Sequence, residues 1–587
     1  MRLFYISVLL LFVPLASLAQ SWQQASINNE QLMTVKNITK PKDMNNAKTL
    51  FSQMAGFPVA AMGNPSFKNF RGLTLEDINN DSISEIIFAA NSTIYAYSFT
   101  GLIWQQALIG TAIYPPSTSD INNDGYPEIV QVTGGSPNNG RVFVFDKDGN
   151  ILTGWPVNFS NHWMICAPVL SDIDNDSVKE IIVCEMISPA GKVHILKIDG
   201  TEYSADWPVI LDGIPAVTPS VADVDNDGDK DIVAYSTKSR YIFNLDGSPK
   251  TGFPITTDPL QNYSYQSPVI ADLDNNGHCE IIGSTHGDAP LFYVMNSDGS
   301  SFPGWPHSVP DSSWTYSAPS VVKINGAWNI FMSRPIGSDA DDMLYGWDAA
   351  GNMLPGFPIV KAGGLEGFIS VADINNDNEF ELVFGSNLLD STGRGFIHAY
   401  KTDGSGELSG FSIRPLGWTF MNGINIGDVN GDNMMDLVAL SYTNSFGAST
   451  DSVYINVYEL NVPYTMEKVL WGTYKGSNER TGFVGEMISN IQTVDAAQGK
   501  ISAYPNPVTD KLKLTWNNFS KGKSLVKITD ITGRIIQKFE CPDFPIGEAT
   551  LELDISALQA GCYFAMLETT DPTSPITIRC AAKIIKR

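Results

Sequence analysis

The chain has 587 residues and a formal net charge of −26, although only 17% of its residues are charged. An excess of Asp and Glu of this size argues against a nucleic-acid binder, which needs Lys and Arg opposite phosphates, and against docking on an anionic lipid surface. Aromatic residues make up 11% and hydrophobic residues 43% of the chain, which excludes an acidic disordered protein.

Residues 1–19 are predicted to be a secretory signal peptide, with a buried N-terminal strand or a membrane anchor as the alternatives. Arg2 supplies the positive start, residues 9–15 form a short apolar run, and Ser17 and Ala19 are the small residues expected before cleavage at Gln20. No later stretch reaches about 18 apolar residues, so we expect a soluble protein exported to the periplasm. Residues 20–56 form an N-terminal segment.

A nine-residue acidic sequence recurs between residues 57 and 484. Its intact copies begin at Asp77, Asp120, Asp172, Asp223, Asp272, Asp373 and Asp428. The successive starts are 43, 52, 51, 49, 101 and 55 residues apart, so the gap of 101 spans two periods. The copy missing from this gap should begin at Lys323, where the acidic residues are absent. We therefore expect eight units, one of which has lost its acidic sequence.

Each unit is predicted to hold about four short strands. An apolar strand such as 180–184 follows each acidic sequence, and a second strand ends in a turn such as Asp148-Gly149. An aromatic residue precedes each unit's acidic sequence; the eight are Phe57, Trp104, Trp155, Trp207, Phe253, Trp305, Phe357 and Phe411. Repeated four-stranded antiparallel sheets are typical of an all-β β-propeller, with eight blades or, if the outermost units combine, seven. A linear β-solenoid is the alternative, but its usual coil is shorter than this period.

The acidic sequence has the oxygen pattern of a calcium loop. Side-chain oxygens at positions 1, 3 and 5, a carbonyl at 7 and a carboxylate at 9 suit Ca²⁺, which takes six to eight oxygen ligands. Position 6 is Gly in three copies; Ser82 and Ser177, which replace it in two others, tolerate a left-handed backbone less well. Zn²⁺ is disfavoured because no Cys or His cluster is present, and Mg²⁺ because it usually keeps several waters. The alternative is a solvated, metal-free turn.

These units resemble FG-GAP/VCBS repeats, the calcium-loop propeller units also found in integrin α-chain heads and in many secreted bacterial proteins. The resemblance implies a propeller at residues 57–484 that is stiffened by up to seven Ca²⁺ ions. The implied ligands are Asp77, Asn79, Asp81, Ile83 and Glu85; Asp120, Asn122, Asp124, Tyr126 and Glu128; Asp172, Asp174, Asp176, Val178 and Glu180; Asp223, Asp225, Asp227, Asp229 and Asp231; Asp272, Asp274, Asn276, His278 and Glu280; Asp373, Asn375, Asp377, Glu379 and Glu381; and Asp428, Asn430, Asp432, Met434 and Asp436.

The chain changes character after this region. Residues 485–500 are interpreted as a linker, and residues 501–587 are predicted to form a small Ig-like β-sandwich with strands near 511–516, 525–529, 534–539, 550–554, 562–568 and 576–585. The segment resembles the type A C-terminal sorting domain of the type IX secretion system of Bacteroidetes. The matching sequences are 504–507 (Tyr-Pro-Asn-Pro), 530–534, 558–561 and the basic end at 583–586. The resemblance implies recognition by the outer-membrane translocon, often followed by removal of the domain by a sortase. An ordinary Ig-like or carbohydrate-binding sandwich is the alternative.

The cysteines leave their pairing open. Cys166 and Cys184 flank one acidic loop and can face each other across a hairpin, while Cys562 and Cys580 can pair near the C-terminus. A buried free thiol is equally compatible with each position.

No sequence motif identifies an active site. The six histidines are scattered, His194 and His398 are expected to be packed or exposed strand residues, and no GxSxG, HExxH or P-loop is present. We favour a secreted or cell-surface binding and adhesion module that holds a protein or polysaccharide on its propeller face, through loops such as 134–140, 337–344 and 443–451. The alternatives are a secreted polysaccharide lyase or glycosidase and a structural envelope protein.

Overall fold

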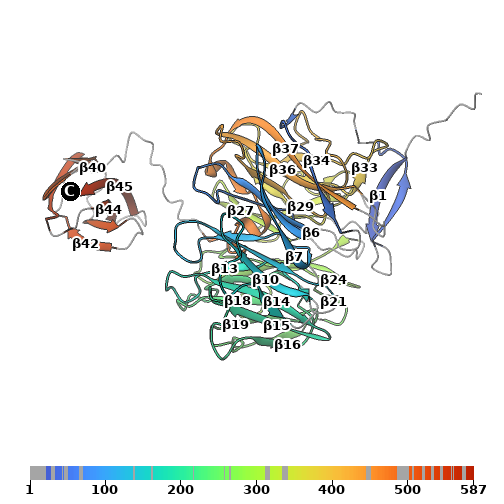
Figure 1. The fold of residues 1–587 in the computed structure, drawn as a ribbon, viewed down its shortest axis with the longest axis horizontal. Coiled ribbons are helices and arrows are strands. Elements are labelled where there is room, and N and C mark those ends of the chain that lie inside the picture. The colour runs from blue at the N-terminus through green and yellow to red at the C-terminus, as the bar shows by residue number, and fades with distance from the viewer. Residues whose placement is uncertain are drawn as a thin grey trace, which may run out of the picture. The chain divides into compact units, whose positions relative to one another are not determined.

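The computed structural model is all-β and divides into two compact units, Met1–Gly485 and Glu486–Arg587 (Figure 1). In the residues that it describes, no helix is long and apolar enough to cross a membrane. It describes residues 21–485 except 28–32, 43, 45–50, 65–70, 136–138, 160–162, 216, 257, 264–265, 311–317, 334–341 and 444–450, and residues 502–586 except 505–507, 519–522, 531–534, 542–546, 557, 559–560 and 571–576. The predicted signal peptide and nearly all of the predicted linker lie outside these residues.

Short antiparallel sheets repeat along the first unit. Each acidic loop connects the first two strands of one sheet. The strands, sheet by sheet, are β5 (Thr74–Glu76), β6 (Glu85–Ser98) and β7 (Gly101–Ala112); β8 (Ser117–Ser119), β9 (Glu128–Thr133), β10 (Gly140–Phe145) and β11 (Val157–Phe159); β13 (Val169–Ser171), β14 (Glu180–Ile187), β15 (Ala190–Leu196) and β16 (Val209–Leu211), with β12 (Trp163–Met164) beside β14; β17 (Ser220–Ala222), β18 (Asp231–Tyr235), β19 (Ser239–Phe243) and β20 (Ile255–Thr256); β22 (Val269–Ala271), β23 (Glu280–Ser284), β25 (Leu291–Met295) and β26 (His307–Ser308), with β21 (Gln261–Asn262) and β24 (His286–Gly287) forming a separate pair; β27 (Ser320–Ile324), β28 (Ala327–Ser333), β29 (Asp342–Asp348) and β30 (Ile359–Val360); β31 (Ser370–Ala372), β32 (Glu381–Gly385) and β34 (Ile397–Lys401), with β33 (Leu388–Leu389) outside this sheet; and β35 (Ile424–Gly427), β36 (Met434–Tyr442) and β37 (Asp451–Pro463).

The sixth sheet has a tight turn where the others have a loop. β27 and β28 are joined by Asn325 and Gly326, both with positive φ (51° and 80°), which fits a two-residue hairpin turn. Lys323, the predicted first position of the missing copy, lies within β27 with its Nζ 5.2 Å from the Trp328 ring centroid. The copy has therefore lost the loop itself as well as its acidic residues.

The repeated tryptophans join neighbouring sheets. The indole N–H of Trp155 donates to the carbonyl of Ile198 at 2.8 Å, beside the Asp199-Gly200 turn of the next sheet. Trp104, Trp207 and Trp305 make the same bond to Lys147, Leu245 and Ala349. A Gly precedes Trp155 and Trp305 and lies close to the turn in both cases: a Cβ on Gly154 would lie 2.7 Å from the Asp199 carbonyl oxygen. Two separate sequence signals, the aromatic motif and the Asp-Gly turn, thus form one contact.

Strands from the N-terminal region pair with strands that come much later in the chain. β4 (Val59–Gly63) pairs along β37, and β3 (Ser52–Gln53) pairs with the same strand. The hairpin of β1 (Trp22–Ile27) and β2 (Met33–Ile38) adds to β33. Because β4 comes before β5 in the sequence and lies on the last sheet, it connects the two ends of the repeat region.

A single segment lies against the first strands of most of these sheets. It comprises residues 466–485, including η2 (Met466–Lys468), β38 (Val469–Trp471) and η3 (Tyr474–Gly476), and we call it the central segment. β38 pairs with β31, and carbonyls of the segment accept from N–H groups of β8, β13, β17, β22 and β35 at 2.8–3.2 Å. Since one short segment reaches all these strands, the sheets surround a common centre. This arrangement is that of a β-propeller.

The buried charges of the central segment are hydrogen-bonded. Arg480, which is 0% exposed, donates to Thr74 Oγ1 at 2.8 Å and to the carbonyls of Tyr474 and Ser477. Lys475 donates to Ser220 Oγ at 2.7 Å. Burial lowers the pKa of Arg480 to about 9. The segment therefore fills the centre of the sheets with polar groups that bond to the surrounding strands and to the segment itself, although Arg480 Nε has no hydrogen-bond partner among the described residues.

The second unit consists of two antiparallel sheets, β39-β40-β43 and β42-β41-β44-β45. Its strands are β39 (Ser502–Tyr504), β40 (Lys511–Asn518), β41 (Lys523–Asp530), β42 (Ile535–Glu540), β43 (Gly547–Asp554), β44 (Gly561–Thr570) and β45 (Thr577–Lys586). Apolar residues from both sheets, among them Leu514, Trp516, Val526 and Ile528, form one core. The six strands expected from the sequence correspond to β40–β45.

The cysteines show two different arrangements. Cys166 and Cys184 are free and buried, and the Cys184 N–H donates to Cys166 Sγ at 3.2 Å. In the second unit Cys562 pairs in register with Ile585 and Cys580 with Leu567. Five residues of a strand span roughly 17 Å, well beyond the Cα separation that a disulfide bridges. Of the two possibilities that the sequence left open, the register therefore rules out a Cys562–Cys580 disulfide.

Candidate metal loops

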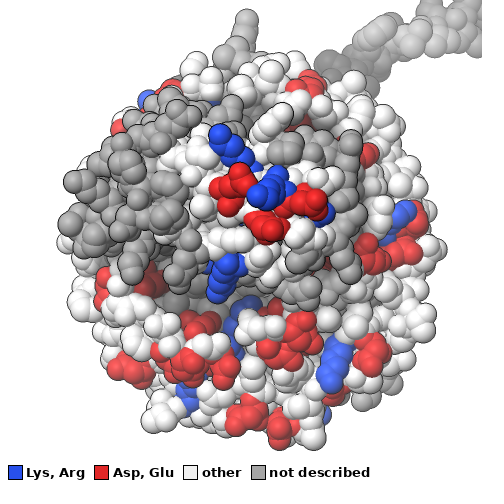
Figure 2. All heavy atoms as spheres, turned by 90° about the vertical axis from the view of Figure 1, so that its left-hand side faces the viewer, with Lys and Arg blue, Asp and Glu red and all other residues white. Residues whose placement is uncertain are grey.

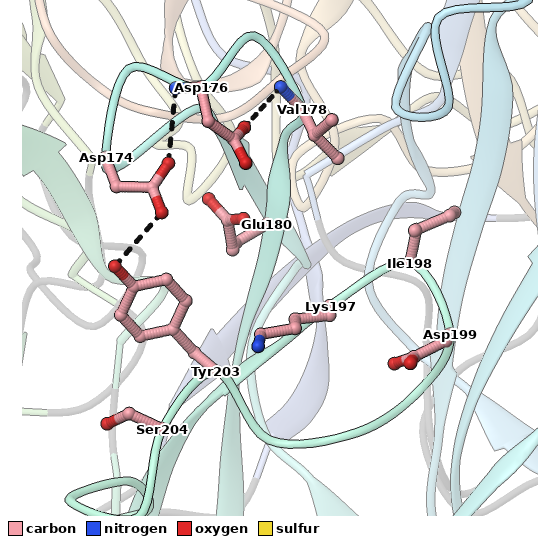
Figure 3. Close-up of a pocket in the computed structure, with 9 residues that line it drawn as sticks. All are labelled: Asp174, Asp176, Val178, Glu180, Lys197, Ile198, Asp199, Tyr203 and Ser204. Atoms are coloured by element: carbon pink, nitrogen blue, oxygen red, sulfur yellow. Dashed lines mark hydrogen bonds between the residues drawn. The ribbon is translucent and has the colours of Figure 1, made fainter.

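Each acidic loop is folded around its own carboxylates. In the loop 172–180, Asp172 accepts from the N–H groups of Asp176 and Ser177 at 3.1 Å, and Asp176 accepts from Val178 at 2.7 Å. Glu180 accepts from the Ile173 N–H at 3.1 Å. Short polar side chains and the N–H groups that they hold thus determine the local backbone. Figure 3 shows Asp174, Asp176 and Glu180 projecting toward a shared space.

The same bonds recur in all seven loops. The position-1 carboxylate accepts from the N–H of position 6, the position-5 oxygen from position 7, and the position-9 carboxylate from position 2. Position 7, proposed to contribute its carbonyl (Ile83 and its equivalents), therefore also anchors position 5 through its N–H. The predicted side chains at positions 1, 3, 5 and 9 lie within one loop in every copy.

Among the described residues, the position-9 carboxylates form no ion pair with Lys or Arg in six of the seven loops, although Lys401 lies near enough to Glu381 to offset part of the rise in its pKa. They are buried, and burial, aided by the neighbouring aspartates, raises the pKa of each to about 7. The residues are Glu85, Glu128, Glu180, Glu280, Glu381 and Asp436; in the seventh loop Asp231 is likewise raised to about 7, and a lysine lies beside it. A cation bound beside these crowded acids would favour their charged form.

The donor sets fit calcium. In three loops the carboxylate oxygens of positions 1, 3 and 9 lie within 4.8 Å of one another: Asp172, Asp174 and Glu180; Asp223, Asp225 and Asp231; Asp272, Asp274 and Glu280. Where position 3 is Asn, its side-chain N–H donates to another loop carboxylate, as Asn79 does to Glu85 at 3.0 Å. An all-oxygen set of carboxylates and amides is the type that Ca²⁺ prefers. These clusters can therefore hold a metal ion.

Position 4 of the acidic sequence also shapes the loops, and the sequence analysis did not assign it a role. Asn80, Asn123, Asn175, Asn226, Asn275 and Asn376 stand there with φ between 58° and 63°, and Gly431 takes the place in the last loop. The Asn80 side chain donates to the Gly125 carbonyl of the next loop at 2.6 Å, and Asn123 donates likewise to Ser177 at 2.7 Å. The available signal was the recurrence of Asn, which accepts a left-handed backbone. In these two copies position 4 links neighbouring loops as well as turning the chain.

Side chains from other segments reach three of the loops. Tyr203 donates to Asp174 Oδ2 at 3.1 Å, beside a pocket of about 460 Å³ that Lys197 and Ser204 also line (Figure 3). Lys468 of the central segment pairs with Asp373 at 2.8 Å. Lys250 pairs with the loop 223–231. The loops are thus alike in backbone but differ in their surroundings.

The acidic side chains are grouped rather than spread evenly. On the face shown in Figure 2, Asp and Glu gather in separate clusters with uncharged residues and a few Lys and Arg between them. This distribution agrees with acidity that is concentrated in repeated loops.

The two strand histidines occupy packing positions. His194 and His398 each stand five residues before the Asp of a turn, where other sheets carry Phe143, Tyr241 or Tyr293. His194 Nδ1 lies 2.7 Å from Glu202 Oε1, and its Nε2 lies 3.1 Å from Glu185 Oε2. His398 Nδ1 lies 2.6 Å from Glu407 Oε1. Both rings are buried and paired, as expected for packed strand residues.

The loops 134–140, 337–344 and 443–451 were expected to form a binding surface, and most of their residues lie outside the described part of the chain.

Comparison with known families decides the identity of both regions. The FG-GAP-like repeat family matches residues 120–183 and 223–283, and the secretion system C-terminal sorting domain matches residues 502–578. The chain carries FG-GAP-like repeats and a type IX secretion sorting domain. Both resemblances inferred from the sequence are thereby confirmed. A search of curated proteins gives no match.

Several solved structures are distantly similar to this chain. The Vibrio cholerae biofilm matrix protein Bap1 is 14% identical, with 70% of this chain and 91% of that chain covered and a TM-score of 0.33. PorZ, a surface component of the type IX secretion system of Porphyromonas gingivalis, is 12% identical, with 96% and 68% covered and a TM-score of 0.30. The polysaccharide lyase Uly1 is 9% identical, with 75% and 98% covered and a TM-score of 0.30.

Proposed function

We propose that this protein is a calcium-stabilised propeller that acts as a binding and adhesion module outside the cell. The sorting domain indicates export by the type IX system to the cell surface or the medium. A signal peptide at residues 1–19 would supply the earlier step into the periplasm. The translocon and a sortase would act on residues 501–587, and residues 485–500 would connect this domain to the propeller.

The central segment is the observation that favours binding over catalysis. Its buried side chains, including Tyr474 and Lys475, occupy the middle of the sheets, where a small substrate would otherwise enter. The surfaces left for a partner are the outer strands and the loops. β7 exposes Leu102, Ile103 and Ile109 on such an outer strand. A rigid scaffold with its centre filled is better suited to holding a large ligand on its surface.

We infer eight blades from the bonds between successive sheets. Hydroxyl groups of first strands donate to the residue before the next first strand, as Ser117 does to Pro168 at 2.6 Å and Ser320 to Ile369 at 2.7 Å. The indole bonds provide further links. The last sheet meets the first through Asn425, which donates to the Leu73 carbonyl at 3.1 Å. With β4 as the outer strand of the last sheet, the ring closes without merging two units.

We further propose that the acidic loops bind calcium when the protein reaches the extracellular medium. Their buried position-9 carboxylates and all-oxygen donor sets support this assignment. When bound, the metal neutralises these carboxylates and cross-links both ends of each loop. The outer loops and strands would then be held in fixed positions for a partner.

A paired assay separates a binding module from an enzyme. The full chain with calcium is applied to a glycan array and to a panel of extracellular proteins, and the same sample is incubated with the polysaccharides that it binds. Binding without shortening of the polysaccharide supports the proposal. Release of oligosaccharides that a single substitution outside the acidic loops abolishes would overturn it in favour of a lyase or glycosidase. Absence of binding on both panels would favour a structural envelope role.

A further inference from the structure

The loop 223–231 has a lysine among its carboxylates. Lys250 Nζ pairs with Asp225 Oδ2, lies 3.1 Å from Asp231 Oδ1 and lies 3.3 Å from Asp227 Oδ2. The lysine side chain is only 11% exposed. One ammonium group therefore contacts the side chains at positions 3, 5 and 9, which are three of the five predicted ligands of this loop.

Lys250 occupies a defined position in the blade. Its N–H donates to the Ile242 carbonyl at 2.8 Å, and its own carbonyl accepts from the N–H of the aromatic residue Phe253 at 3.0 Å. The residues that make the same two backbone bonds in other sheets are Leu152, Phe302, Leu354 and Leu408. Tyr203 makes the first of these bonds in its sheet. Of these six residues, Lys250 alone is charged, so the lysine is a local replacement and not a general feature of the repeat.

We propose that the Lys250 ammonium is the resident cation of the loop 223–231, which therefore keeps its shape without Ca²⁺ while the other six loops depend on the metal. This inference rests on the proposed calcium loading. Asp223, Asp225 and Asp231 lie close enough to hold a metal, but the lysine already occupies the space facing two of them. An ammonium group and Ca²⁺ on these oxygens would lie close enough to repel each other, so the two cations compete for the loop.

The covalent attachment of Lys250 to the blade favours the lysine over a free ion at this site. A side chain attached to the same blade pays no translational entropy when it binds, whereas a free ion does. Expelling Lys250 would also leave its ammonium group without partners in a largely buried place, which is costly. Ca²⁺ would have to overcome both terms in this loop. In the loop 373–381, Lys468 pairs with Asp373 at 2.8 Å and Lys401 lies 3.9 Å from Asp377, so there the contacts are divided between two lysines and no single ammonium group spans three ligand positions.

The loop 223–231 contacts both neighbouring acidic loops, so the presence of the Lys250 ammonium group in it also affects them. Its Lys230 donates to the carbonyl of Asp172 in the preceding loop at 2.7 Å, and the Cys279 N–H of the following loop donates to the Val224 carbonyl at 2.8 Å. A loop that is ordered without calcium thus lies between two loops that are expected to need it. It would keep this part of the ring in place when calcium is scarce.

Counting bound calcium tests the proposal. The full chain is freed of metal with chelator, and Ca²⁺ bound per chain is measured by equilibrium dialysis at saturating calcium. We expect six ions for the wild type and seven for Lys250→Met, which opens the site. An unchanged number in Lys250→Met, with the wild type binding calcium, overturns the inference about Lys250. A wild type that binds no calcium contradicts the proposed loading itself.

A reciprocal variant tests the same position in another blade. Leu152→Lys should place an ammonium group against the loop 120–128 and reduce the count by one. Lys238→Met is the matched control, because Lys238 belongs to the same blade as Lys250 but donates to the Asp212 carbonyl at 3.2 Å, and it should leave the count unchanged. A Leu152→Lys protein that melts cooperatively and still binds the wild-type number of ions would contradict the argument. This test does not depend on whether Lys250→Met folds.

Discussion

At the scale of single residues, the chemistry of the acidic loops is set by the carboxylate at position 9. Glu180 and its equivalents are buried next to other acids, and this raises the pKa of each to about 7. Without metal, these carboxyl groups therefore keep their protons in the folded chain at pH values between 4.5 and about 7, where the unfolded chain has released them. A bound cation removes this conflict because it favours the charged form.

The pH dependence of stability follows from these raised pKa values. Because the folded-state pKa lies above the ordinary value of 4.5, the stability from these groups is fully present below about pH 4.5 and is lost as the pH rises through about 7. In EDTA the melting temperature should fall by several degrees between about pH 5.5 and pH 8. Thermal scans across this range check the prediction.

Calcium should reverse this trend. Ca²⁺ and protons compete for the same carboxylates, so the stabilisation by calcium should increase between the same two pH values. A melting temperature in EDTA that rises toward pH 8, or a calcium effect that is larger at low pH, would contradict the account.

The indole bonds give a second residue-scale prediction. Trp155→Phe keeps an aromatic ring but removes the donor to the Ile198 carbonyl, and it should lower the free energy of unfolding by about 1 kcal/mol. Urea denaturation measures the change. Trp328→Phe is the control, because the Trp328 indole nitrogen is buried and has no hydrogen-bond partner among the described residues. Equal losses in the two variants would mean that packing alone, and not the bond, connects the sheets.

The sequence predicted the loops better than their surroundings. Positions 1, 3, 5 and 9 were readable because each is a polar side chain within nine residues of the others. The contact of Lys250 with Asp231 joins residues that are far enough apart in sequence to depend on the pairing of β18 and β19. The role of Asn80 was equally hidden, since its acceptor belongs to another loop.

At the scale of elements, the central segment is the part of the fold that the repeats did not predict. Its sequence carries neither the acidic loop nor the Asp-Gly turn, so periodicity could place it only at the end of the propeller. The structure puts it against the first strands of several sheets through bonds such as Leu170 N–H to the Glu479 carbonyl at 2.9 Å. The strands themselves were predictable, because alternating apolar residues and turn signals are local.

Arg480 should be the most sensitive residue of this segment. It is fully buried and donates to Thr74 in the first sheet as well as to carbonyls of its own segment. Arg480→Met removes these bonds and leaves the acceptors buried, so it should lower the free energy of unfolding by about 3 kcal/mol or more. Chemical denaturation of the full chain gives the value.

The exposed Arg394 provides the matched comparison for Arg480. Arg394→Met loses one bond, to the Arg414 carbonyl at 2.9 Å, and should change stability by less than about 1 kcal/mol. Similar effects for the two substitutions would show that the central segment does not hold the sheets together.

At the scale of the whole molecule, the ring is closed by distant parts of the chain. β4 precedes the first acidic loop, yet it lies along β37 near the end of the repeats, and the register runs from Asp451 opposite Gly63 to Ile455 opposite Val59. The sequence indicated eight units and left the closure open, because the pairing of two segments about 400 residues apart has no local signal. The net charge of −26, in contrast, is explained by local features repeated around the ring.

Calorimetry of the full chain with and without calcium tests the central claim most directly. Binding to the folded state alone adds stability, about 2.7 kcal/mol for a site at a calcium concentration of 100 times its Kd. With several loops loaded, EDTA should lower the melting temperature by many degrees and excess Ca²⁺ should restore it, while Mg²⁺ should restore little. An identical melting temperature in EDTA and in calcium would contradict a calcium-stabilised propeller.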